Sequence, residues 1–347
     1  MGTNSKRIKV AIVGAGIIGL YLGWKLAEKG CKVAVFERKS KVGEKPCSTL
    51  VSERLVDELR SSSPCAIARV RDFIPLDEST ITNRISSFII HFPKKDITLN
   101  LKIPYLVINR KKLDESLLEL ARKAGAQIEF NRFISKIPEG FDKIIGCDGA
   151  LSKIRECLFL PKPHFRQGIF IRVPRQDFSS QVETWPLNPE AEQARYGAGS
   201  GFLWKIPRGE EIEYGGIGKI DLIRKEFEKF CQKQKRNFLK TELKTSLIPQ
   251  GGLIIPKTKN ITLCGDSMGL TKPWSGGGII WGLKAANILL ENFPDFQKYH
   301  REVKRFFKWK IAKGKLLNSS VYFWGNNFPF VLPGEVNWDN DFPSIFH

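Results

Sequence analysis

IKVAIVGAGIIGLYLGWKLAEKGCKVAVFERK, residues 8 to 39, is the stretch that decides the fold of this 347-residue chain. Its apolar run from Ile8 to Val13 predicts a buried parallel strand, and the apolar helix that follows extends to Ala27 and stops at Gly30. A second buried strand is expected over residues 32–36. Between the first strand and the helix lies a G-x-G-x-x-G pattern, made by Gly14, Gly16 and Gly19. This order predicts the start of a Rossmann-like α/β domain.

Each glycine of the pattern has a physical role in binding a dinucleotide. Gly14 makes the tight turn, Gly16 lets the backbone approach a pyrophosphate, and Gly19 lets helix and strand pack closely. The helix N-terminus offers free N–H groups to the phosphates. Glu37 ends the second strand, where a carboxylate can accept hydrogen bonds from ribose hydroxyls, and Arg38 beside it is a candidate to flank the adenine. The stretch predicts a dinucleotide site without deciding between NAD and FAD.

Two later motifs favour FAD. IIGCDGALSKIR, residues 144–155, places Asp148 at the end of an apolar strand, and ITLCGDSMGLTKPWSGGGIIWGLKAANIL, residues 261–289, does the same with Asp266. An aspartate there lies at the ligand edge of an open α/β sheet, and Asp266 is placed to accept from a ribityl hydroxyl. The second motif continues into a glycine run before a helix, made by Gly276, Gly277 and Gly278. Such a helix N-terminus stabilises the flavin edge that becomes negative on reduction.

The chain resembles flavoproteins of the para-hydroxybenzoate hydroxylase type and, within them, the geranylgeranyl reductase family, including archaeal enzymes that saturate membrane-lipid isoprenoid chains. The resemblance covers about residues 5–290. The segments that carry it are the glycine loop with Glu37, Lys45-Pro46-Cys47-Ser48 with Ser52, GCDGALSKIR, GDSMGLTKPWSGGGIIWGLKAA and, more weakly, Gly201–Pro207. The chain departs from the family pattern at Thr49, where the family usually has Gly, at Ser267-Met268, and in a short segment between 130 and 144.

The resemblance implies a chemistry and a set of partners. Reduced FAD would deliver a hydride to an isoprenoid double bond of a prenyl lipid or prenyl diphosphate, and NAD(P)H or a ferredoxin-like reductant would supply the electrons. Cys47 aligns with a family cysteine near the flavin, where it could donate the proton, assist through water or shape the pocket; it could also be an ordinary loop thiol. Arg110 matches an arginine that contacts the FAD diphosphate or sugar, although a solvated arginine beside Lys111 and Lys112 is the alternative.

The expected fold class is α/β: a Rossmann-like FAD-binding domain, an inserted antiparallel β-sheet substrate (cap) domain and a C-terminal helical tail. The FAD-binding domain is predicted to comprise residues 1–83, 105–160 and 256–290, the cap 84–104 and 161–255, and the tail 291–347. Short strands separated by Gly and Pro predict the cap sheet. The candidate pocket walls are aromatic residues, which are also common in cores: Trp185, Phe202, Trp204 and Tyr214.

The net charge of +20 favours an anionic partner, or else a general lysine coat. Residues 291–317 predict a basic amphipathic helix that either lies on an anionic membrane or packs its apolar stripe on the first domain. The stretch from 321 to 347 is expected to be extended and to pack on the body or close the pocket. The charge is spread along the chain without a recognised nucleic-acid-binding module, so no nucleic-acid partner is expected.

The expected cellular location and the expected lack of a metal site rest on sequence features that are absent. No apolar run of about 18 residues is present, and the N-terminal apolar stretch has no cleavage site, so a cytoplasmic protein, with peripheral membrane contact as an option, is expected. Seven cysteines without a CxxC pair predict mostly reduced thiols, one possible bridge and no metal site. The alternative functions are a flavin monooxygenase of the same fold and a membrane-associated electron-transfer flavoprotein.

Overall fold

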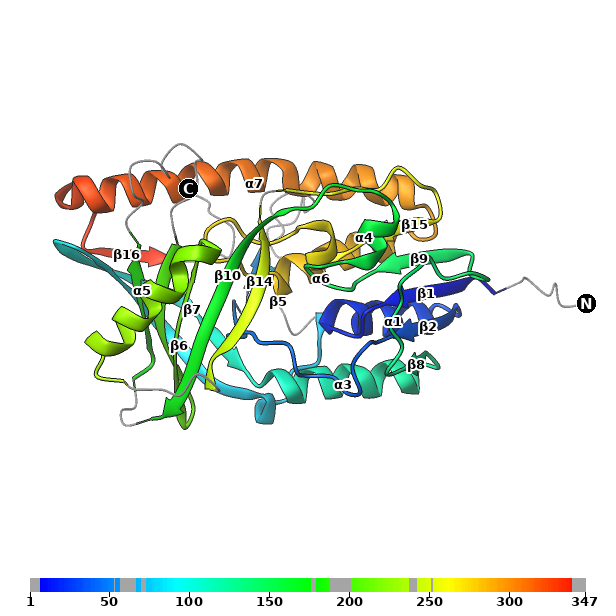
Figure 1. Ribbon diagram of the computed structural model, residues 1–347, viewed down its shortest axis with the longest axis horizontal. Coiled ribbons are helices and arrows are strands. Elements are labelled where there is room, and N and C mark those ends of the chain that lie inside the picture. The colour runs from blue at the N-terminus through cyan, green and yellow to red at the C-terminus, as the bar shows by residue number, and fades with distance from the viewer. Residues whose placement is uncertain are drawn as a thin grey trace, which may run out of the picture.

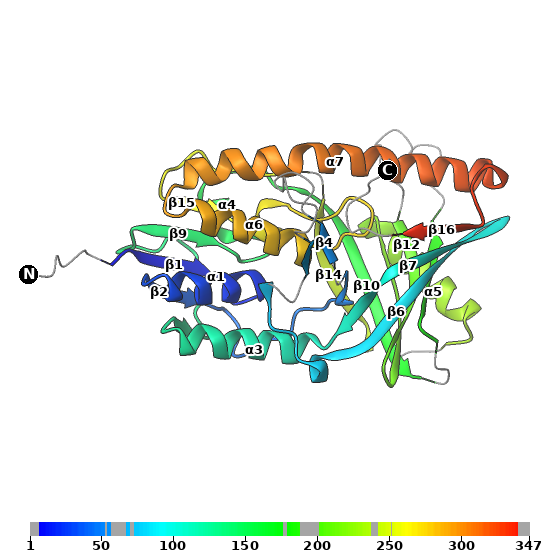
Figure 2. The ribbon, with the colours of Figure 1, turned by 180° about the vertical axis from the view of Figure 1, so that it is seen from behind.

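A computed structural model describes residues 7–52, 54–56, 67–69, 73–175, 179–187, 201–236, 242–250 and 252–338 (Figures 1 and 2). Two predicted features, Cys65 and the part of the extended tail after residue 338, lie outside these residues. The other six cysteines are free thiols. No helix in the described part of the chain combines the length and apolar character that crossing a membrane requires.

The glycine-loop domain is built on a five-stranded parallel sheet. Its strand order is β15-β9-β1-β2-β8, and neighbouring strands run in the same direction. The strands are β1 (Lys9–Val13), β2 (Lys32–Phe36), β8 (Gln127–Glu129), β9 (Lys143–Gly146) and β15 (Ile261–Leu263). Four residues of each of β1 and β2 are buried, as continuous apolar runs predict for a sheet covered on both faces. The predicted bounds of the second strand are confirmed.

Four helices pack beside this sheet: α1 (Ile17–Glu28), α3 (Arg110–Lys123), α6 (Ile279–Asn292) and α7 (Phe296–Asn327). They form a row in the order α3-α1-α6-α7, because α1 contacts α3 and α6, and α6 contacts α7. The helical spacing that predicted α3 is confirmed by its buried residues Leu113, Leu117 and Ala121. Asn109 caps its start by accepting from the Lys112 N–H at 3.2 Å. A short helix, α4 (Lys153–Cys157), begins at Ser152, which accepts from the Arg155 N–H.

The inserted domain is one large sheet with the order β14-β10-β13-β12-β11-β6-β7-β16, with β3 also paired to β7. Its strands are β3 (Leu50–Ser52), β6 (Ile81–Phe92), β7 (Lys95–Ile108), β10 (His164–Pro174), β11 (Gln181–Pro186), β12 (Gly201–Arg208), β13 (Glu211–Gly218), β14 (Lys244–Gln250) and β16 (Glu335–Trp338). The sheet was expected to be antiparallel, but it is mixed: β6–β11 and β7–β16 are parallel. Long connections join these partners, so the chain is free to re-enter the sheet in the same direction.

The two faces of the cap sheet have separate cores. Helix α5 (Ile220–Lys233) covers one face, with Tyr214, Phe227 and Phe230 between helix and sheet. The other face carries Trp204, Ile206 and Ile217. The described residues also include a small pair, β4 (Arg54–Val56) with β5 (Ile67–Arg69), and the 3-10 turns η1 (Glu78–Thr80), η4 (Gly265–Met268) and η5 (Pro329–Val331).

Helix α7 runs along one edge of the whole molecule, past both sheets (Figures 1 and 2). Its residues Phe296, Tyr299, Val303 and Phe307 are buried in the core of the parallel-sheet domain. The helix continues beyond the predicted end at 317 and takes in part of the stretch that was expected to be extended; that part of the prediction is wrong. The first proline after the helix starts is Pro329, so nothing in the covalent chain ends it earlier. The chain then returns as β16 to join the cap sheet.

Candidate functional site

The motifs singled out in the sequence meet at the carboxyl ends of β1, β9 and β15. A Cβ atom placed on Gly14 would lie 2.5 Å from the carbonyl oxygen of Cys147, which joins the first motif to the second. One placed on Gly265 would lie 3.2 Å from the side chain of Ile18, which joins the third motif to the first. Parallel strands end at one edge of a sheet, and this edge is where such sheets bind ligands.

The glycine loop has the backbone geometry that its sequence predicts. Gly14 has φ +103, in the region that favours glycine, and its N–H bonds the Phe36 carbonyl at 2.8 Å. A Cβ on Gly19 would overlap the Gly14 carbonyl oxygen, so only glycine fits there. A Cβ on Gly16 would meet nothing within 4 Å. Gly16 therefore faces open space at the start of α1, whose first turn has no side-chain cap and no acidic residue.

Glu37 sits against this loop. Its Oε2 accepts from the Ala15 N–H at 2.8 Å, and its Oε1 accepts from the Lys39 N–H at 3.0 Å. The carboxylate is thus fixed beside the open start of α1, where a ribose would follow a diphosphate. Arg38 is exposed next to it.

Asp148 stabilises the turn after β9 with one carboxylate oxygen and leaves the other available for a ligand. Its Oδ2 accepts from the backbone N–H groups of Lys153 at 2.6 Å and Ile154 at 3.2 Å. Its Oδ1 is buried and has no hydrogen-bond partner among the described residues. Burial raises the pKa of Asp148, although these N–H groups and the Ser152 hydroxyl oppose the shift. An orphaned acceptor of this kind suits a hydroxyl donor from a bound cofactor.

Asp266 and the second glycine run form one unit at the start of α6. A Cβ on Gly278 would lie 2.6 Å from Asp266 Oδ1, and Lys45 Nζ lies 2.5 Å from Asp266 Oδ2. Gly276 has φ +70, and a Cβ there would lie 2.7 Å from Ile217 of β13. The N-terminus of α6 has no side-chain cap and no acidic residue in its first turn. The run 276–278 therefore lies between Asp266 and the cap sheet.

Cys47 lies in the loop after β2, and arginines of the cap sheet donate hydrogen bonds to that loop. Arg172 donates to the Cys47 carbonyl at 3.3 Å. Arg208 donates to the Ser48 carbonyl, to Thr49 Oγ1 at 3.0 Å and to the Ile108 carbonyl at 3.1 Å. Thr49 adopts φ 48, a left-handed conformation that glycine adopts without strain. The Cys47 side chain is half-buried.

A fully buried carboxylate, Glu213, organises these arginines. It lies 3.1 Å from Arg172 and 3.7 Å from Arg208, and it accepts from Trp204 Nε1 at 3.1 Å. Burial lowers the pKa of Arg208, while Glu213 opposes the shift. Arg208 and Glu213 were not predicted as site residues. Strand alternation could have indicated them, because it places both charged side chains on the apolar face that carries Trp204 and Ile217.

Arg110 begins α3 and is nearly buried. Its Nε donates to Asp114 Oδ1 at 2.7 Å. Burial lowers the pKa of Arg110, but the carboxylate of Asp114, with smaller contributions from Cys47 and Asp266, raises it overall. The start of α3 packs on the loop after β2, since a Cβ placed on Gly43 would lie 2.9 Å from Lys111 Cα.

The four predicted pocket aromatics divide between the two faces of the cap. Phe202 and Trp204 lie on the face that carries Ile217, which approaches Gly276. Tyr214 is 2% exposed and packs under α5, and Trp185 packs there as well, with its ring stacked on His91 at 4.7 Å. The structure therefore brings Phe202 and Trp204, but neither Trp185 nor Tyr214, toward the glycine run 276–278.

These residues fit FAD on three counts: open space beside Gly16 for a diphosphate, an unpaired acceptor on Asp148, and a glycine run with an uncapped helix N-terminus beside Asp266. The fold and the arrangement of these residues are those of FAD-dependent oxidoreductases.

The chain is similar to known sequences of this class. The pattern of the NAD(P)-binding Rossmann-like domain matches residues 12–45, which contain the glycine loop, α1 and β2, a unit that NAD and FAD proteins share. Digeranylgeranylglycerophospholipid reductase 2 of Methanothermobacter thermautotrophicus is 24% identical over 90% of this chain and 86% of its own length. Digeranylgeranylglycerophospholipid reductase of Thermoplasma acidophilum is 25% identical over 88% of this chain and 87% of its own. The chain resembles the geranylgeranyl reductase family, as its motifs predicted.

Solved structures share the fold. A geranylgeranyl bacteriochlorophyll reductase-like protein from Thermoplasma acidophilum superimposes with a TM-score of 0.70, at 19% identity, over 92% of this chain and 88% of its own. A halogenase in complex with FAD gives 0.66 at 14% identity, over 93% and 78%. The oxygenase of 2-methyl-3-hydroxypyridine-5-carboxylic acid gives 0.64 at 14% identity, over 94% and 95%. The fold is thus one used by reductases, halogenases and oxygenases.

Proposed function

We propose that this protein is an FAD-dependent reductase that saturates isoprenoid double bonds of a prenyl lipid or prenyl diphosphate. The observation that carries the proposal is the meeting of the glycine run 276–278 with the apolar face of the cap at Ile217. An unactivated alkene has no polar handle, so an enzyme must hold it by apolar contact and exclude water. The resemblance to archaeal lipid reductases supports the same substrate class.

The chain's own residues would divide the work of binding the cofactor. The open start of α1 at Gly16 and the carboxylate of Glu37 suit the adenosine diphosphate half, with Arg110 as a further anchor for the diphosphate. Asp148 and Asp266 suit hydroxyl groups of the cofactor. The uncapped N-terminus of α6 would stabilise the negative charge of the reduced ring. Bound and reduced, FAD supplies the hydride for one alkene carbon.

The second alkene carbon must receive a proton. Cys47 is the proposed donor, because its loop lies beside Asp266 through Lys45 and is held in place by Arg172 and Arg208. Phe202, Trp204 and Ile217 would form the apolar wall that orients the chain of the substrate and keeps water out. We propose NAD(P)H or a ferredoxin-like protein as the electron donor, and the cytoplasmic face of an anionic membrane as the place of work.

The test is an anaerobic single turnover. Protein carrying reduced flavin is mixed with geranylgeranyl diphosphate or an unsaturated archaeal-type phospholipid. Flavin reoxidation is followed by absorbance, and the mass of the product is measured. The proposal expects reoxidation with a gain of two hydrogens per double bond. Cys47→Ala should slow reoxidation about 100-fold while leaving flavin binding intact. Cys157→Ala, a half-exposed thiol on α4, is the matched control and should behave as wild type.

A monooxygenase is the second candidate, because an oxygenase is among the structural neighbours. It predicts the opposite result. The reduced flavin would stay reduced with every prenyl substrate, and would reoxidise rapidly with oxygen in the presence of an aromatic or polyene substrate. That outcome would replace the reductase proposal.

A further inference from the structure

The side of α7 that faces away from the protein carries large apolar residues. Phe296, Tyr299, Val303 and Phe307 bury the inner side of the helix. On the opposite side, Trp309 is 77% exposed, Leu316 is 69% exposed and Phe323 is 53% exposed. These three are spaced by seven residues, or about 10.5 Å along the axis, so they form one stripe about 21 Å long.

More exposed aromatic residues lie in the last turn of α7 and just beyond it. Trp324, Phe328 and Phe330 are 40%, 41% and 76% exposed. Their rings, together with Phe323, form a connected cluster, with centroid distances of 5.3 Å for Phe323–Trp324, 5.6 Å for Trp324–Phe328 and 6.2 Å for Phe328–Phe330. Single exposed apolar residues are common, but a connected group of exposed rings at the end of the α7 stripe marks an interaction surface.

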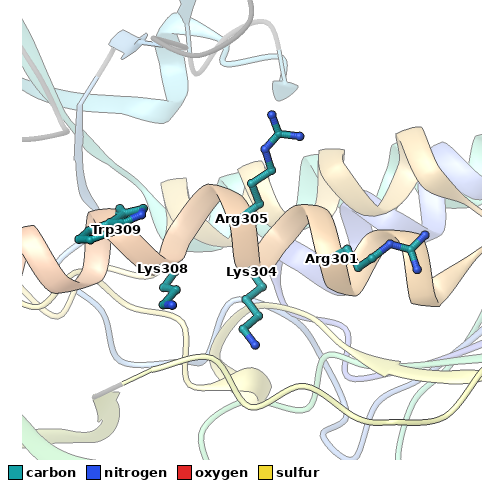
Figure 3. Close-up of a pocket in the computed structure, with 5 residues that line it drawn as sticks. All are labelled: Arg301, Lys304, Arg305, Lys308 and Trp309. Atoms are coloured by element: carbon teal, nitrogen blue, oxygen red, sulfur yellow. The ribbon is translucent and has the colours of Figure 1, made fainter.

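Basic residues lie around the other end of the stripe. Arg301, Lys304, Arg305, Lys308 and Trp309 line a surface hollow of about 330 Å³ (Figure 3). Figure 3 shows Lys304 and Lys308 pointing to one side of the helix and Arg305 to the opposite side. Lys304 and Lys308 also line a second hollow of about 440 Å³ with Leu253, Ile255 and Ile311. The sequence of α7 contains one acidic residue, Glu302, which reaches Arg305 only at 3.9 Å.

We propose that this docking face, defined by Arg301, Arg305, Trp309, Leu316, Phe323 and Phe330, seats the protein on an anionic lipid bilayer, with α7 lying parallel to the surface. The exposed apolar and aromatic side chains enter the headgroup region, and the basic residues contact lipid phosphates. Helical periodicity places Arg301, Arg305, Trp309, Leu316 and Phe323 within one stripe, so one flat surface can reach them together.

Charge decides between a membrane and a second copy of this chain as the occupant. Two copies meeting through this face would bring two sets of arginines and lysines together, with Glu302 as the only acid in each α7. An anionic surface complements the same set, and the net charge of +20 attracts the whole molecule to it. The docking face therefore fits an acidic bilayer and not its own copy.

The docking face would also place the proposed active site near the lipid. Gly314, on the inner side of α7, is packed so closely on Trp274 that an added Cβ would lie 2.7 Å from its ring, and 3.4 Å from Pro273. Both residues belong to the loop that leads into the glycine run 276–278. One helix, about 10 Å in diameter, thus separates the membrane side from this loop. This step rests on the proposed function, whereas docking itself does not.

The experiment measures binding to vesicles of fully saturated lipid, which contain no bond to reduce, so its outcome is independent of the reductase activity. Full-length protein is co-sedimented with saturated phosphatidylglycerol or phosphatidylcholine vesicles over a range of salt concentrations. We expect binding to phosphatidylglycerol that weakens with salt, and at least about tenfold weaker binding to phosphatidylcholine. Equal binding to both lipids, or no binding to either, overturns the proposal.

Two double variants locate the surface. Trp309→Ser/Leu316→Ser should reduce binding at least about tenfold, and Arg301→Gln/Arg305→Gln about 25-fold, at about fivefold per basic residue. The controls change exposed residues on other elements. Phe133→Ser/Leu222→Ser alters side chains that are 56% and 36% exposed. Arg122→Gln/Lys123→Gln lies on α3, on the other side of the molecule (Figures 1 and 2). Controls that lose as much binding as the α7 variants, or α7 variants that only convert a dimer to a monomer, overturn it.

Discussion

Lys45 and Asp266 form an ion pair, with 2.5 Å between Nζ and Oδ2, that joins the loop after β2 to the turn after β15. The two residues are 221 positions apart in the sequence. The same aspartate lies against the glycine run at the start of α6, so one carboxylate links the Cys47 loop to that helix N-terminus. This contact places the residues proposed for proton donation and for flavin binding side by side.

Asp266→Asn should weaken FAD binding more than it weakens the fold. The change removes a charge acceptor for a cofactor hydroxyl, for which we expect about a tenfold loss of FAD affinity, or about 1.4 kcal/mol. Lys45 is 45% exposed, so the ion pair itself should contribute less than about 1 kcal/mol to the unfolding free energy of the apoprotein. Flavin titration and urea unfolding measure the two effects. Glu156→Gln, which breaks the exposed Lys153 pair, is the control, and unchanged FAD affinity in Asp266→Asn would remove Asp266 from the site.

Gly16→Ala should impair FAD binding, whereas Gly19→Ala should destabilise the fold. A Cβ on Gly16 meets no protein atom within 4 Å, so the apoprotein should unfold as wild type does, while the methyl group obstructs the approach of a diphosphate. A Cβ on Gly19 overlaps the Gly14 carbonyl, so that variant should lose about 2 kcal/mol or more of unfolding free energy. Urea unfolding and flavin content distinguish them. A Gly16→Ala protein that retains full FAD affinity would contradict the assignment of the open space.

Glu213→Gln should destabilise the fold more than any exposed charge change, because it leaves Arg208 without its buried counter-charge. Breaking a buried ion pair typically costs about 3–5 kcal/mol. The partly exposed Arg172 tempers this, so we expect about 3 kcal/mol in urea unfolding. The control, Glu183→Gln, breaks the less buried pair with Lys205 and should lose about 1 kcal/mol or less. Equal effects would show that the Glu213 carboxylate does not hold the two arginines.

Local sequence predicted the parallel sheet and the motif residues, because each depends on interactions within a short stretch. The strand at 32–36 and the glycine loop follow from burial and backbone sterics alone. The contact of Lys45 with Asp266 and the arginine–Glu213 network depend on how the cap sits on the first domain, which no local pattern specifies.

Local sequence also did not predict which face of the cap sheet each aromatic residue occupies. Trp204 and Tyr214 are both buried aromatics on neighbouring strands, yet they lie on opposite faces. Strand alternation separates them once the register is known, and the register is set by pairing between strands. The length of α7 was likewise missed because its outer half is held by contacts with the cap, such as Tyr322 O–H to the Gly201 carbonyl at 2.7 Å.

His300 should make the fold less stable as the pH falls. It lies on α7 with Nε2 2.8 Å from the buried Thr262 hydroxyl, and burial lowers its pKa to about 4. The unfolded chain, with an ordinary histidine pKa of about 6.5, binds more protons between these two values, so the unfolding free energy decreases as pH falls through that window. The full shift corresponds to about 3.4 kcal/mol, which partial exposure of the ring reduces to about 1.5 kcal/mol.

Measuring the difference between variants isolates this contribution from the carboxylates that titrate in the same range. Unfolding free energies of wild type and His300→Gln are compared at about pH 7 and about pH 4.5. The loss on acidification should be about 1–1.5 kcal/mol smaller in His300→Gln, because the neutral amide takes up no proton when the chain unfolds. His164→Gln, at an exposed position on β10, should lose as much stability as wild type. Equal losses in all three proteins would mean that His300 can be protonated in the folded state as readily as in the unfolded chain.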